Sequence, residues 1–254
     1  MDGVAFWAAA VAASVLVGMS KGGLPAVSML GVPVLALVVN PVTAAGLLLP
    51  VFVLSDVFGL YAYRHAFDRR VVAILVPGMV AGVAFGWATA ALVPGWTVTA
   101  LVGGIGFVFA LNLLLRQRGA AGSRPARLAP GLFWGSITGF TSFVSHSGAP
   151  PYQVYTLPLG MTKTVFAGTS TIAFAILNAV KLVPYWQLGQ LSAANLKVAV
   201  VLMPGAALSV FAGVRLINGR HEVAFFRFVT WTLLALSLKL IWDGLSGGLA
   251  GAVM

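Results

Sequence analysis

The sequence predicts an all-α polytopic membrane protein made of two inverted repeats, with broken or re-entrant helices at its centre. Of its 254 residues, 60% are hydrophobic and only 8% are charged. Apolar runs of about 20 residues, each long enough to cross a bilayer, cover most of the chain. The second half repeats polar and glycine-rich motifs of the first, and arginine-rich loops recur at intervals along the chain. These three observations together exclude a soluble domain.

Hydropathy divides the chain into two repeats joined by a linker. The first repeat covers residues 1–117, with apolar segments at 4–19, 26–39, 42–62, 71–92 and 97–116. A basic cytoplasmic linker rich in Gly, Ser, Pro and Arg follows at 118–129. The second repeat covers 130–254, with apolar segments at 130–144, 151–160, 163–183, 194–214 and 222–242. Segment 151–160 is too short to span a bilayer, which favours a half-helix or a re-entrant hairpin. Three or five crossings per half both remain open.

The repeat is clearest at two polar interruptions of the apolar pattern. Ser20-Lys21-Gly22-Gly23-Leu24-Pro25 aligns with Ser145-His146-Ser147-Gly148-Ala149-Pro150. The register continues beyond the motif, because Asp56 aligns with Asn178 after a small deletion. Matching breaks in the two halves of a duplicated membrane protein are a strong sequence indication of a transporter binding site.

Arginine-rich loops predict the topology. Loops 64–70, 116–127 and 215–227 carry most of the positive charge and are placed in the cytoplasm. Loops 94–96 and 184–195 and both chain ends carry little positive charge and are placed outside. The loop at 64–70 is therefore inside, whereas its counterpart in the second half is outside. The two halves are predicted to run in opposite directions through the membrane.

The two breaks predict an anion site. Glycines end one helix in each break and a proline starts the next, which leaves backbone N–H groups at a positive helix N-terminus. Lys21 and His146 place a basic side chain at the aligned position of both halves, and a lysine at bilayer depth is costly. The alternatives are a structural partner of Asp56 or a snorkelling residue for Lys21, and a packing histidine for His146. The expected substrate-binding residues are Ser20, Lys21, Gly22, Gly23, Pro25, Ser145, His146, Ser147, Gly148 and Pro150.

Other polar residues within spans are candidates for supporting roles. Asp56 and its repeat mate Asn178 form a candidate coupling site, since intramembrane carboxylates often relay protons. Asp56 equally suits a structural role beside Lys21. The expected cavity-lining residues are Gln153, Tyr155, Thr169, Ser170 and Thr171. Three lysines near predicted span ends are interpreted as interfacial anchors, namely Lys163, Lys181 and Lys239.

Several functional classes are disfavoured. The chain has no cysteine and no P-loop, which argues against thiol chemistry and ATP-driven pumping. No metal site is expected, because His65, His146 and His221 share no helical spacing. The charge of +10 lies mainly in short loops and does not indicate nucleic-acid binding. Ser145 and His146 are sequence neighbours that need not face one another, so no enzyme and no cofactor is expected.

The motifs resemble the sulfite exporter TauE/SafE family of bacterial inner-membrane permeases. The resemblance rests on Gly18 to Pro25, Gly139 to Pro151, Pro158 to Lys163 and Gly168 to Ser170, and covers almost the whole chain. It implies a secondary transporter of sulfite, a sulfonate or a similar sulfur anion in the inner membrane, with a proton or sodium as candidate coupling ion. It leaves the anion, the direction and the oligomeric state open. The alternatives are an anion channel on the same scaffold or an accessory membrane subunit.

Overall fold

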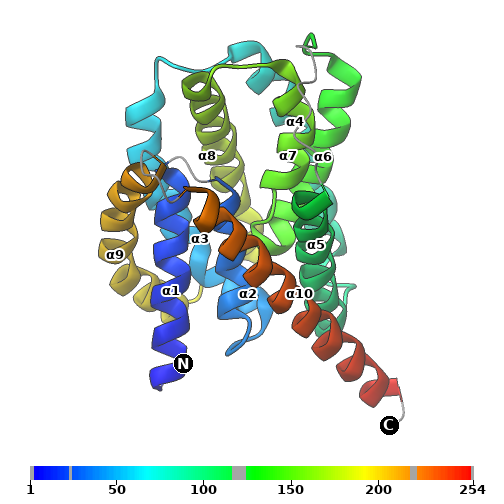
Figure 1. Cartoon of the computed structure of the whole chain (residues 1–254). Coiled ribbons are helices and arrows are strands. Elements are labelled where there is room, and N and C mark those ends of the chain that lie inside the picture. Colours follow the sequence, from blue (N-terminus) through cyan, green and yellow to red (C-terminus); the bar gives the residue numbers. More distant parts are fainter. Residues whose placement is uncertain (1–2, 23–24, 116–123, 218–221, 253–254) are drawn as a thin grey trace.

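The computed structural model describes residues 3–22, 25–115, 124–217 and 222–252, and every regular element within these ranges is helical (Figure 1). The first half contains α1 (Val4–Lys21), η1 (Pro25–Leu30), α2 (Gly31–Leu35), α3 (Pro41–Tyr63), α4 (Arg69–Ala90) and α5 (Gly95–Leu115). The second contains α6 (Leu128–Ser145), α7 (Ala149–Thr156), η2 (Leu157–Leu159), α8 (Lys163–Gln187), α9 (Ala193–Ile217) and α10 (Glu222–Ala252). The prediction of an all-α protein is confirmed.

Polar caps set where several of the long helices begin. The Asn40 side chain accepts from the backbone N–H of Thr43 at the start of α3. Asp68 caps α4 in the same way, and Thr162 caps α8. Each cap satisfies a backbone donor that has no partner within the helix. The long helices therefore begin close to the predicted span boundaries.

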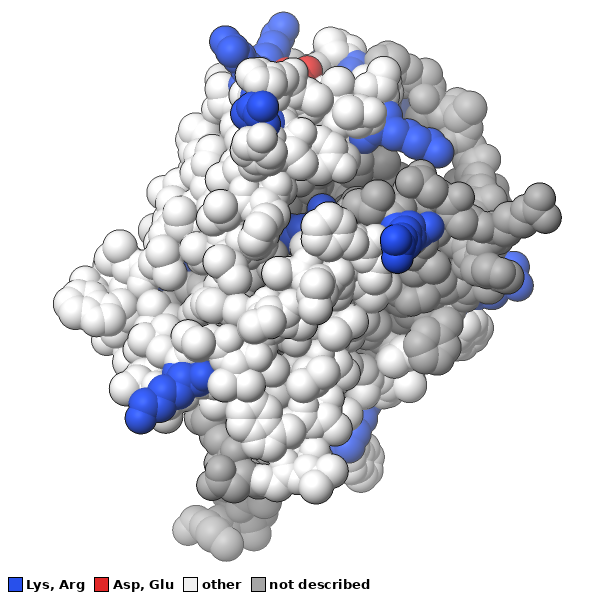
Figure 2. Space-filling model, turned by 90° about the vertical axis from the view of Figure 1, so that its left-hand side faces the viewer, with Lys and Arg blue, Asp and Glu red and all other residues white. Residues whose placement is uncertain are grey.

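Six of the described helices are long and apolar enough to cross a bilayer, which supports the multi-pass membrane assignment. They are α1, α3, α4, α5, α8 and most of α9. Much of the face shown in Figure 2 carries no charged side chain. Large apolar side chains lie exposed on several of these helices, for example Phe85, Val108 and Leu208. In contrast, the segments after the two breaks are short: η1 with α2, and α7 with η2. The expected half-helix at 151–160 is therefore present as the eight-residue α7.

The two halves meet along α3 and α8, which are the predicted counterparts in the repeat. Near one end of this contact Gly46 lies against Gln190, and toward the other Gly59 lies against Thr171. The two helices therefore run antiparallel, and Asp56 meets Asn178 between these points. Helices α5 and α10, also predicted to be counterparts, pack together as well. Antiparallel counterparts are what an inverted duplication requires, and the inversion itself remains a prediction.

Close helix packing depends on glycine at a few positions. A Cβ on Gly82 of α4 would lie 2.0 Å from the Ser136 carbonyl oxygen of α6, and one on Gly139 of α6 would lie 2.0 Å from the Met79 oxygen. Helices α4 and α6 therefore approach backbone to backbone, as small residues allow in membranes. Gly104 of α5 instead faces open space, so close packing does not require glycine at that residue.

Candidate functional site

The first break ends α1 and turns the chain into a short helical segment. Lys21 is the last residue of α1, and the backbone N–H of Gly22 closes the helix by donating to Met19 O at 3.1 Å. The chain restarts at Pro25, the first residue of η1, as the sequence predicts. Gly23 lies outside the described residues.

The second break ends α6 through a left-handed residue. His146 has φ 54°, and its N–H donates to Ser142 O at 3.0 Å while Ser147 N–H donates to Thr141 O at 3.3 Å. The bond from His146 N–H to Ser142 O closes an αL-type helix end, whose left-handed position glycine usually occupies. A histidine in this conformation is uncommon and costs backbone strain, which points to a role for its ring.

The start of α7 offers fewer backbone donors than the sequence predicts. Gly148 precedes the helix without a side-chain cap, and the helix begins Ala149-Pro150-Pro151. Two of its first three residues are prolines and have no N–H. Only Gly148 and Ala149 supply N–H groups at this end, so side chains have to provide most of the positive charge.

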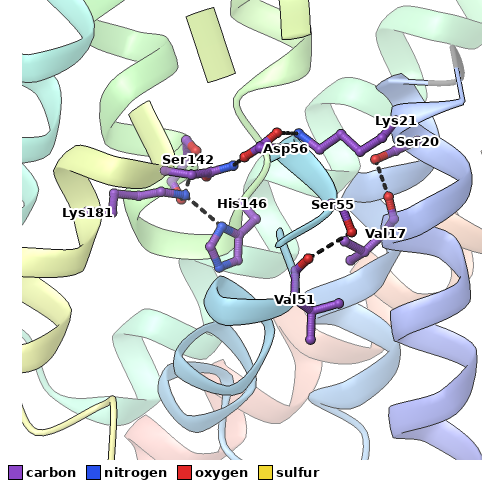
Figure 3. A network of polar contacts seen from close by, with 10 residues as sticks. Val17, Ser20, Lys21, Val51, Ser55, Asp56, Ser142, His146 and Lys181 are labelled. Carbon is purple, nitrogen blue, oxygen red and sulfur yellow. Dashed lines mark hydrogen bonds and ion pairs between the residues drawn. The ribbon is translucent and has the colours of Figure 1, made fainter. Parts of the chain in front are cut away.

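Three residues from three helices form a polar chain beside the first break (Figure 3). Lys21 Nζ lies 2.5 Å from Asp56 Oδ1, and Asn178 Nδ2 donates to Asp56 Oδ2 at 2.6 Å. The Lys21 and Asp56 side chains are only 9% and 5% exposed, and Asn178 is buried. Both oxygens of Asp56 therefore contact a partner. In this structure Asp56 forms the ion pair with Lys21 that the sequence predicts as its alternative, structural role.

A second polar cluster surrounds His146. Lys181 Nζ lies 2.7 Å from His146 Nδ1, 3.0 Å from Ser142 Oγ and 3.2 Å from Ser142 O. The other ring nitrogen, Nε2, lies 2.9 Å from the carbonyl oxygen of Ala45. A carbonyl can only accept, so Nε2 carries the proton and Nδ1 accepts from Lys181. His146 thus links Lys181 of α8 to the start of α3.

A small polar cavity lies between the two clusters. It has a volume of about 40 Å³, which is space for a few water molecules or a small anion. The lining residues come from both halves and are Ser20, Lys21, Ser28, Phe52, Ser142, His146, Ala149, Ser170, Thr171, Phe174 and Asn178. Both breaks thus open onto one cavity, as expected for paired breaks.

The expected serine donors bond to their own segments. Ser20 Oγ donates to Val17 O at 2.6 Å, Ser145 Oγ to Thr141 O at 3.3 Å, and Ser147 Oγ to Ser145 O at 3.2 Å. Carbonyls near a helix end capture a nearby hydroxyl easily. Of the three serines, only Ser20 lines the cavity.

The expected lining residues divide into two groups. Ser170 and Thr171 line the cavity, whereas Gln153, Tyr155 and Thr169 do not. Tyr155 instead donates its hydroxyl to Arg127 O at 3.0 Å. Thr169 donates to Val165 O and accepts from Asp68 N–H, which ties α8 to the start of α4. These hydrogen bonds hold the Tyr155 and Thr169 hydroxyls away from the cavity.

The interpretation of Lys181 as an interfacial anchor is wrong. Lys181 is 0% exposed to solvent, because α8 continues to Gln187 and packs against α3. Lys163 and Lys239 are exposed, as anchors should be. The available signal was the spacing from Asn178, since residues three apart share a helix face. Ser142 and Phe52 are further cavity residues that sequence reasoning missed.

Comparison with known families agrees with this geometry. The family model described as Sulfite exporter TauE/SafE matches residues 10–240, which include both breaks and both polar clusters. The protein is a member of the sulfite exporter TauE/SafE family. No curated protein and no solved structure matches the chain. Membership makes this TauE/SafE protein a membrane transport protein of a non-enzymatic family, as predicted.

Proposed function

We propose that this TauE/SafE protein is a secondary transporter that carries a small sulfur-containing anion, sulfite or a sulfonate, across the bacterial inner membrane by alternating access. The observation that carries the proposal is an excess of buried basic groups at the cavity. Lys21 and Lys181 lie at or beside it, and Asp56 is the carboxylate that faces them. With both lysines protonated the site would carry one unbalanced positive charge, which is costly at bilayer depth, so an anion entering the cavity stabilises that protonated form.

The cavity size favours a small ligand. About 40 Å³ suits an inorganic anion or a compact sulfonate group. Its walls combine the Lys21 ammonium and the Asn178 amide with the apolar rings of Phe52 and Phe174. Polar groups that converge on a cavity and are held in place beside apolar rings are typical of small-molecule sites.

Two features support alternating access over a static pore. The cavity lies where the broken segments of both halves converge, and repeat mates Asp56 and Asn178 bond directly across the interface. Rocking one half against the other would break or remake such contacts.

The start of α1 and the end of α10 lie at the lower end in Figure 1, away from the α3–α4 connection with Arg64 and Arg69. This separation supports outside termini and a cytoplasmic α3–α4 loop.

Thermal stabilisation of the purified full chain tests the proposal. The panel comprises sulfite, methanesulfonate, thiosulfate, sulfate, phosphate and acetate. A bound anion at about one hundred times its Kd adds about 2.7 kcal/mol, which a melting curve detects. We expect selective stabilisation by a sulfur anion, weakened when Lys21→Met and Asp56→Asn are combined, because the cavity then loses the Lys21 ammonium and no lone charge of the pair remains. The control Lys239→Met alters an exposed lysine and should keep the response. Stabilisation by none of the anions would contradict the proposal.

Flux measurements then separate a carrier from the channel alternative. In proteoliposomes, a carrier accelerates labelled sulfite uptake when unlabelled sulfite is present on the opposite side. A channel shows no such trans-acceleration. Its absence, combined with conductance in planar bilayers, would replace the alternating-access proposal with an anion channel.

A further inference from the structure

We infer that Lys181 carries the coupling proton, binding it together with the transported anion and releasing it with the anion on the other side. The inference rests on the proposed anion transport and assigns its coupling group. It moves the proton site from Asp56, the candidate favoured by sequence, to a lysine that hydropathy alone places near an interface. The exchange is a single proton between water and the Nζ lone pair, with no other bond made or broken.

The first argument is the unequal pairing of the two buried lysines. Lys21 has a carboxylate partner in Asp56 at 2.5 Å. Among the described side chains, Lys181 forms no ion pair with a carboxylate, although it is fully buried. A lone buried ammonium is expensive, so such a lysine is stable as the neutral amine until an anion arrives.

The second argument is that the surroundings of Lys181 suit both of its protonation states. As an ammonium it has three hydrogens, and three acceptors lie within 3.2 Å, namely His146 Nδ1, Ser142 Oγ and Ser142 O. As an amine it has a lone pair, to which the Ser142 hydroxyl can rotate and donate. His146 remains an acceptor in both states, because its Nε2 proton is bonded to Ala45 O.

The third argument comes from the repeat. The Lys21–Asp56 pair has His146 and Asn178 as its counterparts, and neither carries a charge in the arrangement observed. The position aligned with Lys181 is Gly59, which lies against Thr171 without a side chain of its own. Lys181 is therefore the basic group that the duplication does not balance.

The charged groups around Lys181 are already paired, so Lys181 is the group whose protonation changes when the anion binds. Around it lie His146 at the end of α6, Asp56 of α3, Lys21 of α1 and, on α8 itself, Tyr185, whose hydroxyl donates to Phe143 O. Helix α4, which also packs on α8, has charged residues only in its first turn, and α7 has none. Asp56 is already bonded at both oxygens.

Charge balance then follows in both states of the cycle. Without substrate, Lys21 and Asp56 cancel and Lys181 is neutral. With a monovalent anion bound, the anion cancels a protonated Lys181. The site therefore carries no net charge, either empty or with the anion bound, when its access changes from one side to the other. This avoids the cost of moving net charge through hydrocarbon. The result is electroneutral symport of one proton with one monovalent anion.

Proton uptake on binding tests the inference. The purified full chain is mixed with methanesulfonate, or with sulfite, in weak buffer with a pH indicator. We expect about one proton taken up per anion by the wild type above the pH at which Lys181 loses its proton. In that range, apparent affinity should fall about tenfold per pH unit. Lys181→Arg holds a permanent charge, so its binding should be independent of pH and accompanied by no proton uptake.

Control variants make the result interpretable. Lys163→Met alters an exposed lysine of the same helix and should behave as the wild type. If Lys181→Arg does not fold, Lys181→Met replaces it and should also lose the proton signal. Comparison of each variant with the wild type on the same anion removes protons exchanged by sulfite itself. Anion binding by the wild type without proton uptake, or unchanged uptake in the Lys181 variant, would overturn the inference. Failure of the wild type to bind any anion would instead overturn the proposed function.

Discussion

Replacing one member of the Lys21–Asp56 pair should destabilise this TauE/SafE protein far more than replacing both. The ammonium and carboxylate lie 2.5 Å apart and are nearly inaccessible to solvent. At an effective dielectric constant of about 20, their attraction is about 7 kcal/mol before desolvation is subtracted. Removing one partner leaves the other charge buried, which costs about 3–5 kcal/mol. Removing both leaves neither charge, and buried pairs are often replaced at little net cost.

We therefore expect Lys21→Met and Asp56→Asn each to lower the free energy of unfolding by about 3–5 kcal/mol. The double variant should return to within about 1 kcal/mol of the wild type. Unfolding is followed by tryptophan fluorescence as a denaturing detergent is added to protein in mild detergent. The Lys239–Asp243 pair is a matched control within α10. Its side chains are 55% and 42% exposed, so Lys239→Met should cost less than about 1 kcal/mol.

Two results would refute this reasoning. Single Lys21 or Asp56 variants as mild as Lys239→Met would mean that the pair is hydrated in solution. A double variant as unstable as the sum of the singles would mean that the two side chains act separately.

Two further predictions concern packing and site charge. Gly82→Ala would place a Cβ 2.0 Å from the Ser136 oxygen, so we expect a loss of about 1–3 kcal/mol or more and a lower melting temperature. Gly104→Ala has open space and should gain up to about 1 kcal/mol; equal effects would show that α4 and α6 do not pack this closely. Asn178→Asp would add a carboxylate beside Asp56, where like charges about 4 Å apart repel by about 4 kcal/mol. Anion affinity, measured by titration calorimetry, should fall at least tenfold, and unchanged affinity would separate Asn178 from the site.

Much of the fold could be predicted because hydropathy and caps are local properties. Span positions follow from apolar runs, and the two breaks follow from glycine and proline within them. Length alone predicts that segment 151–160 is too short to span, as a half-helix or a re-entrant hairpin, and the structure has the short helix α7 there. The convergence of both breaks on one cavity agrees with the expectation drawn from repeat symmetry, because paired breaks in a duplicated chain tend to meet near its centre.

The roles of individual side chains were harder to predict from the sequence. Ser145 and Ser147 looked like substrate donors, yet carbonyls within one turn accept their hydroxyls. Lys181 looked like an anchor because hydropathy ends the span at residue 183. Its burial depends on α8 continuing to Gln187 and on the packing of α3, which no local window contains.

The sequence by itself determined the membrane class, the family resemblance and the location of the two breaks, and it predicts the duplication, because each depends on residue order along the chain. Only the tertiary structure decided which buried charges are partners. Lys21 meets Asp56, and Lys181 meets His146, in contacts between residues 35 apart in sequence. In a low-dielectric interior the energy of a charge is set by its neighbours within a few ångströms. Which groups lie that close to a charge is decided by how the helices pack.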